Sequence, residues 1–481
     1  MNNFGFNFDN TYAKLPEIMA TKISPVPVKQ PELVILNTHL AEELGLNFSN
    51  TSPQDLANLF SGNILPEGSE PIAQAYCGHQ FGHFVMLGDG RAHLLGEHIN
   101  PKKTKVDIQF KGSGRTPYSR MGDGRAALGP MLREYLISEA MHHLGIPTTR
   151  SLAVVRTGEM IRRETKLKGA ILTRVAASHL RVGTFQYVAA KQDLNALKQL
   201  VDYAVARHYP ELLNSQNKAV ALFKTVMKRQ AKLVTEWLRV GFIHGVMNTD
   251  NVSISGETID YGPCAFMDQY DPKTVFSSID HYGRYAFGSQ SIITKWNLAR
   301  FAESLLPLLA EDEKKAVGVA EDLIRSYDET FENHFHEMMK KKLGLISNEE
   351  NDKTIISELL NLMYNNQSDY TNTFRYLINN KLPQNKLLND TGFITWEQKW
   401  KNRIKQNQEE ALNLMIENNP AFIPRNHLVE EALKDADDGN FEKFELLLNV
   451  LKKPYNEQPE YQNYSLPAPV TDKIYKTFCG T

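Results

Sequence analysis

The spacing of apolar residues changes well before the middle of the chain, and this change limits the folds that the chain can adopt. Residues 106–111 alternate between apolar and polar side chains, which is the period of a half-buried β-strand with Lys111 at the end of its polar face. Beyond residue 190 the spacing becomes helical, as in the apolar stripe over residues 220–238 that ends before Gly241. A strand-rich first part followed by a helix-rich second part predicts an α+β chain with two lobes.

The length of the chain predicts more than one packed unit. At 481 residues it exceeds the roughly 250–300 residues at which a single hydrophobic core stops growing. We predict an N-terminal lobe over residues 1–185, a helical lobe with the catalytic and metal motifs over residues 186–300, and a helical extension with a tail over residues 301–481. One strong helix is expected within the first lobe, from Leu128 to near Gly145.

The charge and the cysteine count argue against several classes of function. The chain has 54 basic and 56 acidic residues, so its net charge of −2 gives no electrostatic reason to expect binding to nucleic acid or to an anionic membrane. Its three cysteines cannot form a disulfide framework. No targeting segment is recognisable at the start, and no apolar stretch approaches about 18 residues. We expect a cytoplasmic protein.

The segment HGVMNTDN, residues 244–251, is the most informative motif. Protein kinases place a His and an Asn at this spacing in the catalytic loop, and the motif D-F-G follows after a short hairpin. Here Asp260-Tyr261-Gly262 follows at that distance, and we expect residues 251–262 to form the hairpin. Asn251 and Asp260 could then share a divalent cation bound to nucleotide phosphates. The alternative is a surface hairpin in which these two residues are incidental.

Val246 departs from the kinase pattern, because it stands where a kinase has its catalytic Asp. A valine side chain cannot accept a proton. The nearest carboxylate belongs to Asp250. Either the fold has lost catalysis, or Asp250 is the base in a reaction of different geometry, so ordinary kinase chemistry is disfavoured.

Lys111 is expected to pair with a glutamate of the following helix. Glu134 matches the kinase arrangement in which a helix glutamate holds a strand lysine against phosphate oxygens, and Glu139 is the competing candidate. A solvated surface pair is the ordinary alternative for a Lys and a Glu.

Two glycine-containing segments are candidates for phosphate binding. Residues 83–95 are expected to form a hairpin around Gly88-Asp89-Gly90. Residues 111–129 are rich in glycine, which allows close backbone approach to an anion, and a flexible basic loop is the alternative. No Walker or Rossmann pattern is present. The arginines that would add phosphate contacts are Arg115, Arg120 and Arg125 of this stretch and, between the lobes, Arg174 and Arg181.

Several long strings resemble selenoprotein O and its bacterial relatives, from about Phe6 to the C-terminus. They include AYCGHQFGHFVMLGDGRAHLLGE, QFKGSGRTPYSRMGDGRAALGPMLREYLISEAM, HGVMNTDN and IDYGPCAFMD. The resemblance implies a protein-kinase-like fold that transfers AMP from ATP to Ser, Thr or Tyr hydroxyls of proteins, with the nucleotide bound in a flipped orientation. It also implies manganese-dependent transfer of UMP from UTP in bacterial members, and the chain itself is one candidate acceptor.

The resemblance also assigns roles to individual residues. Asp250 would accept the proton, Asn251 and Asp260 would hold Mg²⁺ or Mn²⁺, and Glu134 would pair with Lys111. The nucleotide contacts would be Gly88, Gly90, Arg91, Lys111, Asp123, Gly124, Arg174 and Arg181. Two other functions stay open, an ATP-dependent phosphotransferase and a nucleotide-binding scaffold without turnover. Release of pyrophosphate rather than ADP would distinguish the transferase from the phosphotransferase.

Two cysteines suggest redox control. Cys479 stands where animal members of the family carry selenocysteine, and Cys264 follows shortly after Asp260. We expect oxidation to link Cys264 to Cys479 and to lower activity. The alternative is that Cys264 is a small core residue and Cys479 a free thiol.

Overall fold

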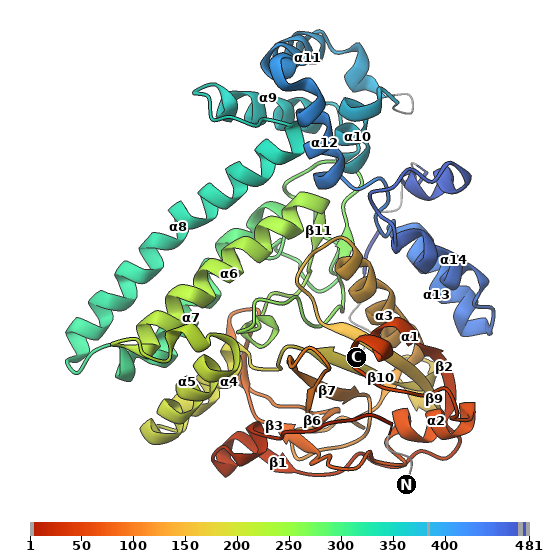
Figure 1. Ribbon diagram of the computed structural model, residues 1–481, viewed down its shortest axis with the longest axis vertical. Helices are drawn as coiled ribbons and strands as arrows, with labels where there is room; N and C mark the ends of the chain where they lie inside the picture. Colours follow the sequence, from red (N-terminus) through yellow and green to blue (C-terminus); the bar gives the residue numbers. More distant parts are fainter. Residues whose placement is uncertain (1–3, 382–384, 470–474, 478–481) are drawn as a thin grey trace.

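The chain forms a sheet-containing lobe, a helical lobe and a helical extension in the computed structural model, which describes residues 4–381, 385–469 and 475–477 (Figure 1). The α+β class and the two-lobe, protein-kinase-like arrangement are as predicted. The exact boundaries at residues 185 and 300 stay predictions. The main sheet is formed by β1 (Ala20–Lys22), β2 (Glu32–Leu36), β3 (Ile72–Gln74), β6 (Ala92–Ile99), β7 (Lys105–Lys111), β8 (Ala126–Ala127), β9 (Arg150–Arg162) and β10 (Lys166–Ala176).

Both faces of this sheet are covered. Its strands follow the order β1-β3-β6-β7-β10-β9-β2, with β8 beside β10, and neighbouring strands are antiparallel. Helices α1 (Thr38–Glu43) and α2 (Pro53–Ser61) pack on one face, where Ile108 and Phe110 are buried. Helix α3 (Leu128–His143) packs on the other face, against β9 and β10. It ends before Gly145, as the sequence predicts.

The polar face of strand β7 is not open to solvent, and this corrects the prediction of a half-buried strand. Asp107, Gln109 and Lys111 are all buried. Their side chains contact charged or polar groups of neighbouring elements instead of water. The alternation in the sequence identified the strand, but the polar stripe belongs to an internal network of charges.

The predicted hairpin over residues 83–95 is wrong. Strand β5 (His83–Met86) pairs with β4 (Cys77–Gln80) in a separate two-stranded sheet. The residues after Gly88-Asp89-Gly90 enter β6, which pairs with β7 and β3. The glycine-containing turn therefore connects two sheets, which places it at the edge of a cleft instead of at the tip of a hairpin.

The predicted hairpin over residues 251–262 is also wrong. Ser253 forms an isolated bridge with Arg181, and Thr258 forms one with Thr148, so the two halves of this segment bond to other parts of the chain and not to each other. The short strands nearby, β11 (Phe242–Ile243) and β12 (Ala265–Phe266), pair across the whole loop.

Long helices form the second lobe. Its helices are α4 (Val182–Ala190), α5 (Leu194–His208), α6 (Lys218–Val240), α7 (Gln290–Leu309) and α8 (Glu313–Leu343). Helix α6 contains the predicted stripe. The Asn217 side chain caps its N-terminus by accepting a hydrogen bond from the Val220 N–H, and Gly241 ends it in the left-handed region at φ 76°. Helix α8 continues from this lobe to the extension (Figure 1).

The extension returns to the first lobe. Its helices are α9 (Asp352–Asn365), α10 (Tyr370–Asn379), α11 (Thr391–Ile404), α12 (Gln408–Asn418), α13 (Asn426–Asp438) and α14 (Glu442–Leu451). Helices α13 and α14 pack on α3, so the extension supports the helix that carries Glu134. Residues Pro459–Ser465 form a 3₁₀ helix that is interrupted at Tyr461. Cys479 lies outside the described residues and Cys264 is buried, so the disulfide stays a prediction.

Candidate active site

A cleft of about 810 Å³ lies beside the glycine-containing turn and the glycine-rich loop of the first lobe. Two of its glycines are required by close contacts. A Cβ atom at Gly88, where φ is 141°, would lie 2.4 Å from the Tyr118 ring, and one at Gly124, where φ is 71°, would lie 2.2 Å from the Gly114 backbone. The predicted site residues that line the cleft are Gly88, Gly90, Arg91, Arg120, Asp123, Gly124, Arg125 and Asp250.

A cluster of four charged side chains is formed by Lys111, Glu134, Arg174 and Asp260. Lys111 Nζ lies 2.7 Å from Glu134 Oε2 and also contacts Asp260. Arg174 donates to Glu134 from Nε at 2.7 Å, and its Nη2 lies 3.1 Å from Asp260 Oδ1. The pair of Lys111 with Glu134 is therefore present. Glu139 binds Arg150 instead, with two hydrogen bonds of 2.8 Å.

The cluster keeps both of its carboxylates ionised. Burial by itself would raise the pKa of Asp260, but the Lys111 ammonium and the Arg174 guanidinium hold that pKa well below its usual range. Burial would likewise raise the pKa of Glu134, but the Arg174 guanidinium and the Lys111 ammonium outweigh this effect and lower that pKa. Asp260 also has φ 68°, which is uncommon for a residue other than glycine and indicates a backbone held in place by its surroundings.

Arg181 is a buried cation with at least one N–H donor that has no hydrogen-bond partner among the described residues. It is the N-cap residue of α4, and its guanidinium stacks on the Tyr76 ring at 4.3 Å. Its Nη1 donates to the Asp250 carbonyl at 3.3 Å, and its Nη2 lies 3.8 Å from Asp89 Oδ1. Its Nε is buried and has no partner among the described residues. A buried donor without a partner is costly, so this side chain is suited to receive an anionic ligand.

Asp250 lines the cleft, and one of its carboxylate oxygens has no hydrogen-bond partner among the described residues. Its Oδ1 is buried and accepts no hydrogen bond from any described residue. Burial raises the pKa of Asp250 to about 6, although the Arg181 guanidinium opposes the rise. The carboxylate is thus ionised at neutral pH and more basic than an ordinary aspartate, which is the property that a general base needs.

Gly78 of strand β4 is the position that leaves room for this carboxylate. A Cβ atom there would lie 2.2 Å from Asp250 Oδ1 and 2.7 Å from Leu87 Cδ1. We expect Gly78→Ala to displace the carboxylate and to reduce the turnover number at saturating nucleotide. Overpacking of this kind costs about 1–3 kcal/mol, so the variant should remain folded. Steady-state kinetics with a thermal melt checks this, with Gly129→Ala as the control because nothing lies within 4 Å of a Cβ there. Unchanged turnover in Gly78→Ala would contradict the placement of Asp250.

The catalytic-loop motif explains how a valine can replace the kinase aspartate. The Asn251 Nδ2 donates to the Val246 carbonyl at 3.0 Å, so position 246 supports Asn251 through its backbone while its side chain is buried. The buried His244 ring donates from Nε2 to the Ile259 carbonyl at 3.0 Å, directly before Asp260. His244 thereby connects the two halves of the motif without contacting the cleft.

The oxygen atoms of Asn251 and Asp260 suit a hard divalent cation. Asp260 is ionised and its side chain is 30% exposed, and the bond from Asn251 Nδ2 leaves its Oδ1 as the oxygen that can ligate. Among residues 4–381, 385–469 and 475–477, no group of three or more His, Cys, Asp or Glu side chains could hold a metal alone. Magnesium commonly takes only one or two protein ligands and completes its shell with phosphates and water, so the residues fit.

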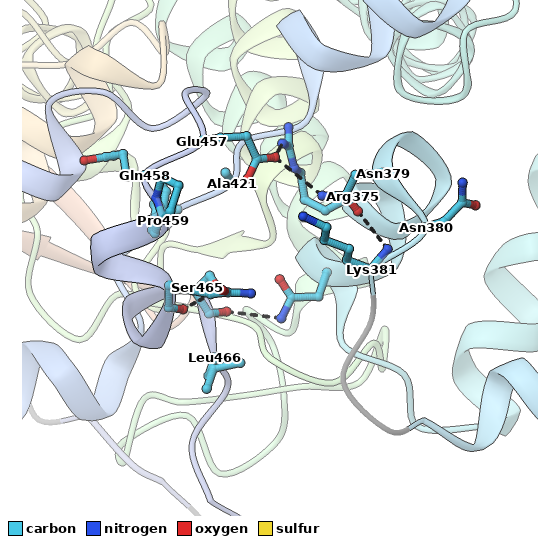
Figure 2. Close-up of a pocket in the computed structure, with 13 residues that line it drawn as sticks. Arg375, Asn379, Asn380, Lys381, Ala421, Glu457, Gln458, Pro459, Ser465 and Leu466 are labelled. Carbon is cyan, nitrogen blue, oxygen red and sulfur yellow. Dashed lines mark hydrogen bonds and ion pairs between the residues drawn. The ribbon is translucent and has the colours of Figure 1, made fainter.

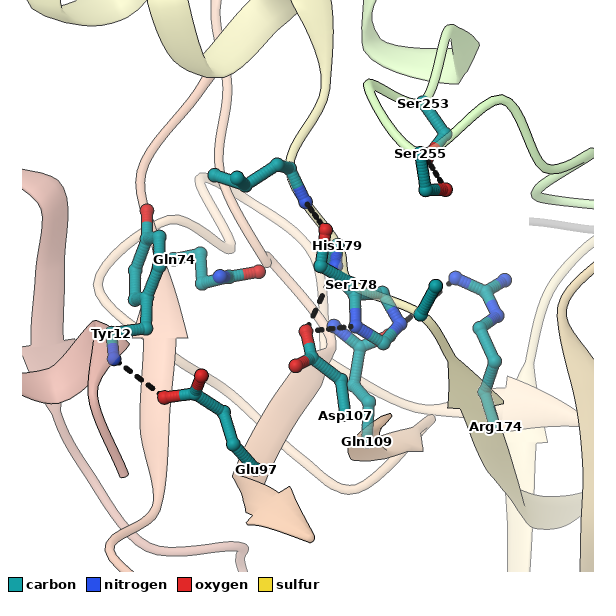
Figure 3. Close-up of polar contacts among 12 residues, drawn as sticks. Tyr12, Gln74, Glu97, Asp107, Gln109, Arg174, Ser178, His179, Ser253 and Ser255 are labelled. Carbon is teal, nitrogen blue, oxygen red and sulfur yellow. Dashed lines mark hydrogen bonds and ion pairs between the residues drawn. The ribbon is translucent and has the colours of Figure 1, made fainter. Parts of the chain in front are cut away.

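Several residues of the site were not identified from the sequence. Asp89 is buried between Gly88 and Gly90, where its Oδ2 accepts from the Gln74 N–H at 3.1 Å and lies 3.3 Å from Gln109 Nε2. Its position in the Gly-Asp-Gly turn was a usable signal. Asp107 and His179 form a buried pair that also went unnoticed (Figure 3). Their separation in the sequence gives no local signal.

Asp123 lies at the mouth of the cleft, where it binds a protein side chain. Its carboxylate accepts from Arg163 at 2.7 and 3.1 Å and from the Arg125 N–H at 2.9 Å. Arg125 itself pairs with Glu159. These contacts hold the glycine-rich loop against strand β9.

A second hollow, of about 500 Å³, lies in the extension (Figure 2). It is bordered by α10 and the chain around Pro459, and Arg375 and Glu457 form an ion pair across it. None of the predicted site residues lines it.

The fold and the pair of Lys111 with Glu134 define a protein-kinase-like enzyme. A family model described as "Protein adenylyltransferase SelO" matches residues 3–452, and the chain belongs to this family. It is therefore a nucleotidyltransferase. Among the residues that the structure describes, none of the helices combines the length and apolar character that crossing a membrane requires.

Curated relatives match along their whole length. "Protein nucleotidyltransferase YdiU" from Nitrosococcus oceani is 58% identical over 483 residues, covering 100% of this chain and 98% of the relative. The protein of the same name from Anoxybacillus flavithermus is 57% identical over 488 residues, covering 100% of both chains. A solved structure of ROP2 from Toxoplasma gondii, described as having a protein-kinase fold and no enzymatic activity, covers 60% of this chain and 87% of its own at 9% identity. Its TM-score of 0.25 is too low to support any argument.

Proposed function

We propose that this chain transfers AMP from ATP to Ser, Thr or Tyr hydroxyls of proteins and releases pyrophosphate. The observation that carries the proposal is the unpartnered, buried carboxylate oxygen of Asp250 at a cleft whose kinase base position is occupied by Val246. The family description and the printed names of the relatives support transfer of a nucleotide to protein.

Asp250 and the cations of the site have separate tasks in this reaction. Asp250 accepts the proton of the acceptor hydroxyl while the hydroxyl oxygen forms a bond to the α-phosphorus of ATP. The bond between the α-phosphorus and the oxygen bridging to the β-phosphorus breaks, and its electron pair leaves with pyrophosphate. Lys111, Arg174 and Arg181 balance the charge of the phosphates. A divalent cation held by Asn251 and Asp260 would supply further neutralisation of that charge.

The glycine-lined cleft fits the remaining part of the nucleotide. Gly88, Gly90 and Gly124 allow the backbone to approach a ligand closely, and Arg91 lies beside them. We expect Mg²⁺ or Mn²⁺ as the metal and a location in the cytoplasm. UTP with Mn²⁺ is a second nucleotide to test, and the chain itself is a candidate acceptor alongside other proteins.

The position of a radioactive label on ATP tests the proposal. With α-labelled ATP and Mg²⁺ or Mn²⁺, label should become covalently attached to a protein acceptor or to the chain, because the α-phosphoryl group is transferred. With γ-labelled ATP, no covalent label is expected, because the γ-phosphate leaves in pyrophosphate. Stoichiometric attachment of γ-label would contradict the proposal and identify a phosphotransferase, and no label from either would favour a scaffold.

A further inference from the structure

The connection between the two lobes, residues 177–181, is held by buried side chains, and we propose that Asp107 and His179 position Arg181 for the nucleotide phosphates. This segment runs from the end of β10, which carries Arg174, to the N-cap of α4, which is Arg181. The inference rests on the proposed function, since Arg181 has a phosphate to bind only when a nucleotide occupies the cleft.

His179 is attached to Asp107 through both its backbone and its ring (Figure 3). The His179 N–H donates to Asp107 Oδ2 at 2.8 Å, and His179 Nδ1 lies 3.0 Å from the same oxygen. Both residues are buried, with 1% of His179 exposed. Burial lowers the pKa of His179, so the neutral ring donates from Nδ1 to the carboxylate. Two bonds to one oxygen fix the position of this residue on strand β7.

Arg207 of α5, in the helical lobe, also binds the connection over residues 177–181. Its Nη2 donates to Asp107 Oδ1 at 2.9 Å and to the Ala177 carbonyl at 2.8 Å, and its Nη1 contacts Glu97. The Ala177 N–H donates to Glu257 Oε2 at 2.9 Å. Burial would raise the pKa of Asp107, but Arg207 and His179 lower it. Charged side chains of strands β6 and β7 and of helix α5 therefore hold residues 177–181 in place. Their hydrogen bonds and ion pairs are buried away from water.

Arg181 depends on this anchoring because its guanidinium has few strong contacts of its own. The closest polar contact of the guanidinium is the 3.3 Å hydrogen bond from Nη1 to the Asp250 carbonyl, and its Nη2 lies 3.8 Å from Asp89 Oδ1. The backbone on either side is fixed to the catalytic loop, since the Ile254 N–H donates to the Leu180 carbonyl at 2.8 Å and the Val182 N–H to the Val252 carbonyl at 2.9 Å. The Asp107–His179 pair fixes the backbone two residues before Arg181 as well.

His179 does not take part in the chemistry directly. It is not among the residues that line the cleft, and its Nε2 is buried without a partner among the described residues. The pair of a carboxylate and an imidazole resembles a catalytic dyad, but no reacting group can reach it. Asp107 and His179 are therefore positioning residues that act through Arg181.

Two matched amide variants test the position of the hydrogen-bond donor. His179→Asn keeps an N–H near the place of Nδ1, whereas His179→Gln moves it toward the place of Nε2. We expect His179→Gln to weaken ATP binding about 10–100-fold, the range that corresponds to the loss of a buried hydrogen bond to a charged group. His179→Asn should stay within a few-fold of the parent chain. Calorimetry with ATP and steady-state KM and kcat measure both, alongside a thermal melt. Equal losses in the two variants, or wild-type affinity in both, would overturn the proposal.

A double-mutant cycle with Arg181→Ala tests whether the effect passes through Arg181. In the Arg181→Ala chain, His179→Gln should change the ATP dissociation constant less than about 2-fold, because there is no guanidinium left to position. The same factor in both backgrounds would show that His179 acts by another route. If His179→Gln does not fold, Asp107→Asn takes its place and must show the same non-additivity. Wild-type ATP affinity in Arg181→Ala alone would contradict the nucleotide site itself and not the anchoring of the connection.

Discussion

Asp260→Asn should abolish detectable transfer and weaken nucleotide binding in the presence of metal. The substitution removes the ionised ligand of a hard cation and also leaves Lys111 and Arg174 with one carboxylate fewer. Since loss of an outer-shell partner costs about 10–100-fold in metal affinity, loss of a direct charged ligand should exceed about 10²-fold. Titration of ATP binding at several Mg²⁺ concentrations gives the apparent metal affinity, and an acceptor-labelling assay gives turnover.

Asp369→Asn is the matched control for Asp260→Asn. Asp369 is a buried carboxylate paired with Arg425 at 2.7 Å, in the extension. Removing its charge should lower the melting temperature, because the buried Arg425 then keeps only one carboxylate partner, Asp268. The metal dependence of ATP binding should not change. If Asp260→Asn bound metal and ATP as tightly as the parent chain, the assignment of Asp260 as a ligand would be wrong.

Asp250→Asn should separate chemistry from binding. The amide has nearly the same shape and fits beside Gly78, but it cannot accept the proton of the acceptor hydroxyl. General base catalysis contributes typically about 10²–10⁴-fold, so the turnover number should fall by that factor while the ATP dissociation constant stays close to that of the parent. Rapid-quench or initial-rate labelling at saturating ATP measures the first quantity and calorimetry the second.

Asp202→Asn serves as the surface control for this variant, because Asp202 is an exposed residue that pairs with Lys218. It should change neither quantity, since exposed ion pairs contribute little. Normal turnover at saturating ATP in Asp250→Asn, with or without weaker binding, would exclude Asp250 as the base.

Local patterns in the sequence were sufficient to predict the elements that carry the site. The alternation before Lys111, the helical spacing after Leu128 and the stripe that ends before Gly241 are properties of adjacent residues, and the corresponding elements β7, α3 and α6 form where expected. The choice between Glu134 and Glu139 could not be made in this way. Both are buried on α3, and Glu139 is bound by Arg150, a residue on another element.

The predictions that failed depended on which partner covers a strand or a face, and that partner can be near in the sequence, as for β5, or far along the chain, as for β7. Strand β5 lies next to β4 because of pairing that the turn residues Gly88-Asp89-Gly90 do not determine. The polar face of β7 has the period of a solvent-facing surface, yet α5 provides Arg207 to neutralise Asp107 there. Alternation identifies which residues share a face, but it does not indicate whether water or a charged network covers that face.

The identity of the leaving group tests the central claim most directly. The chain, ATP, Mg²⁺ or Mn²⁺ and a protein acceptor are incubated together, and pyrophosphate and ADP are quantified beside the mass gained by the intact acceptor. We expect one pyrophosphate released for each AMP added to the acceptor, no ADP above background, and loss of both signals in Asp260→Asn. Release of ADP with a mass gain of one phosphoryl group on the acceptor would contradict the claim.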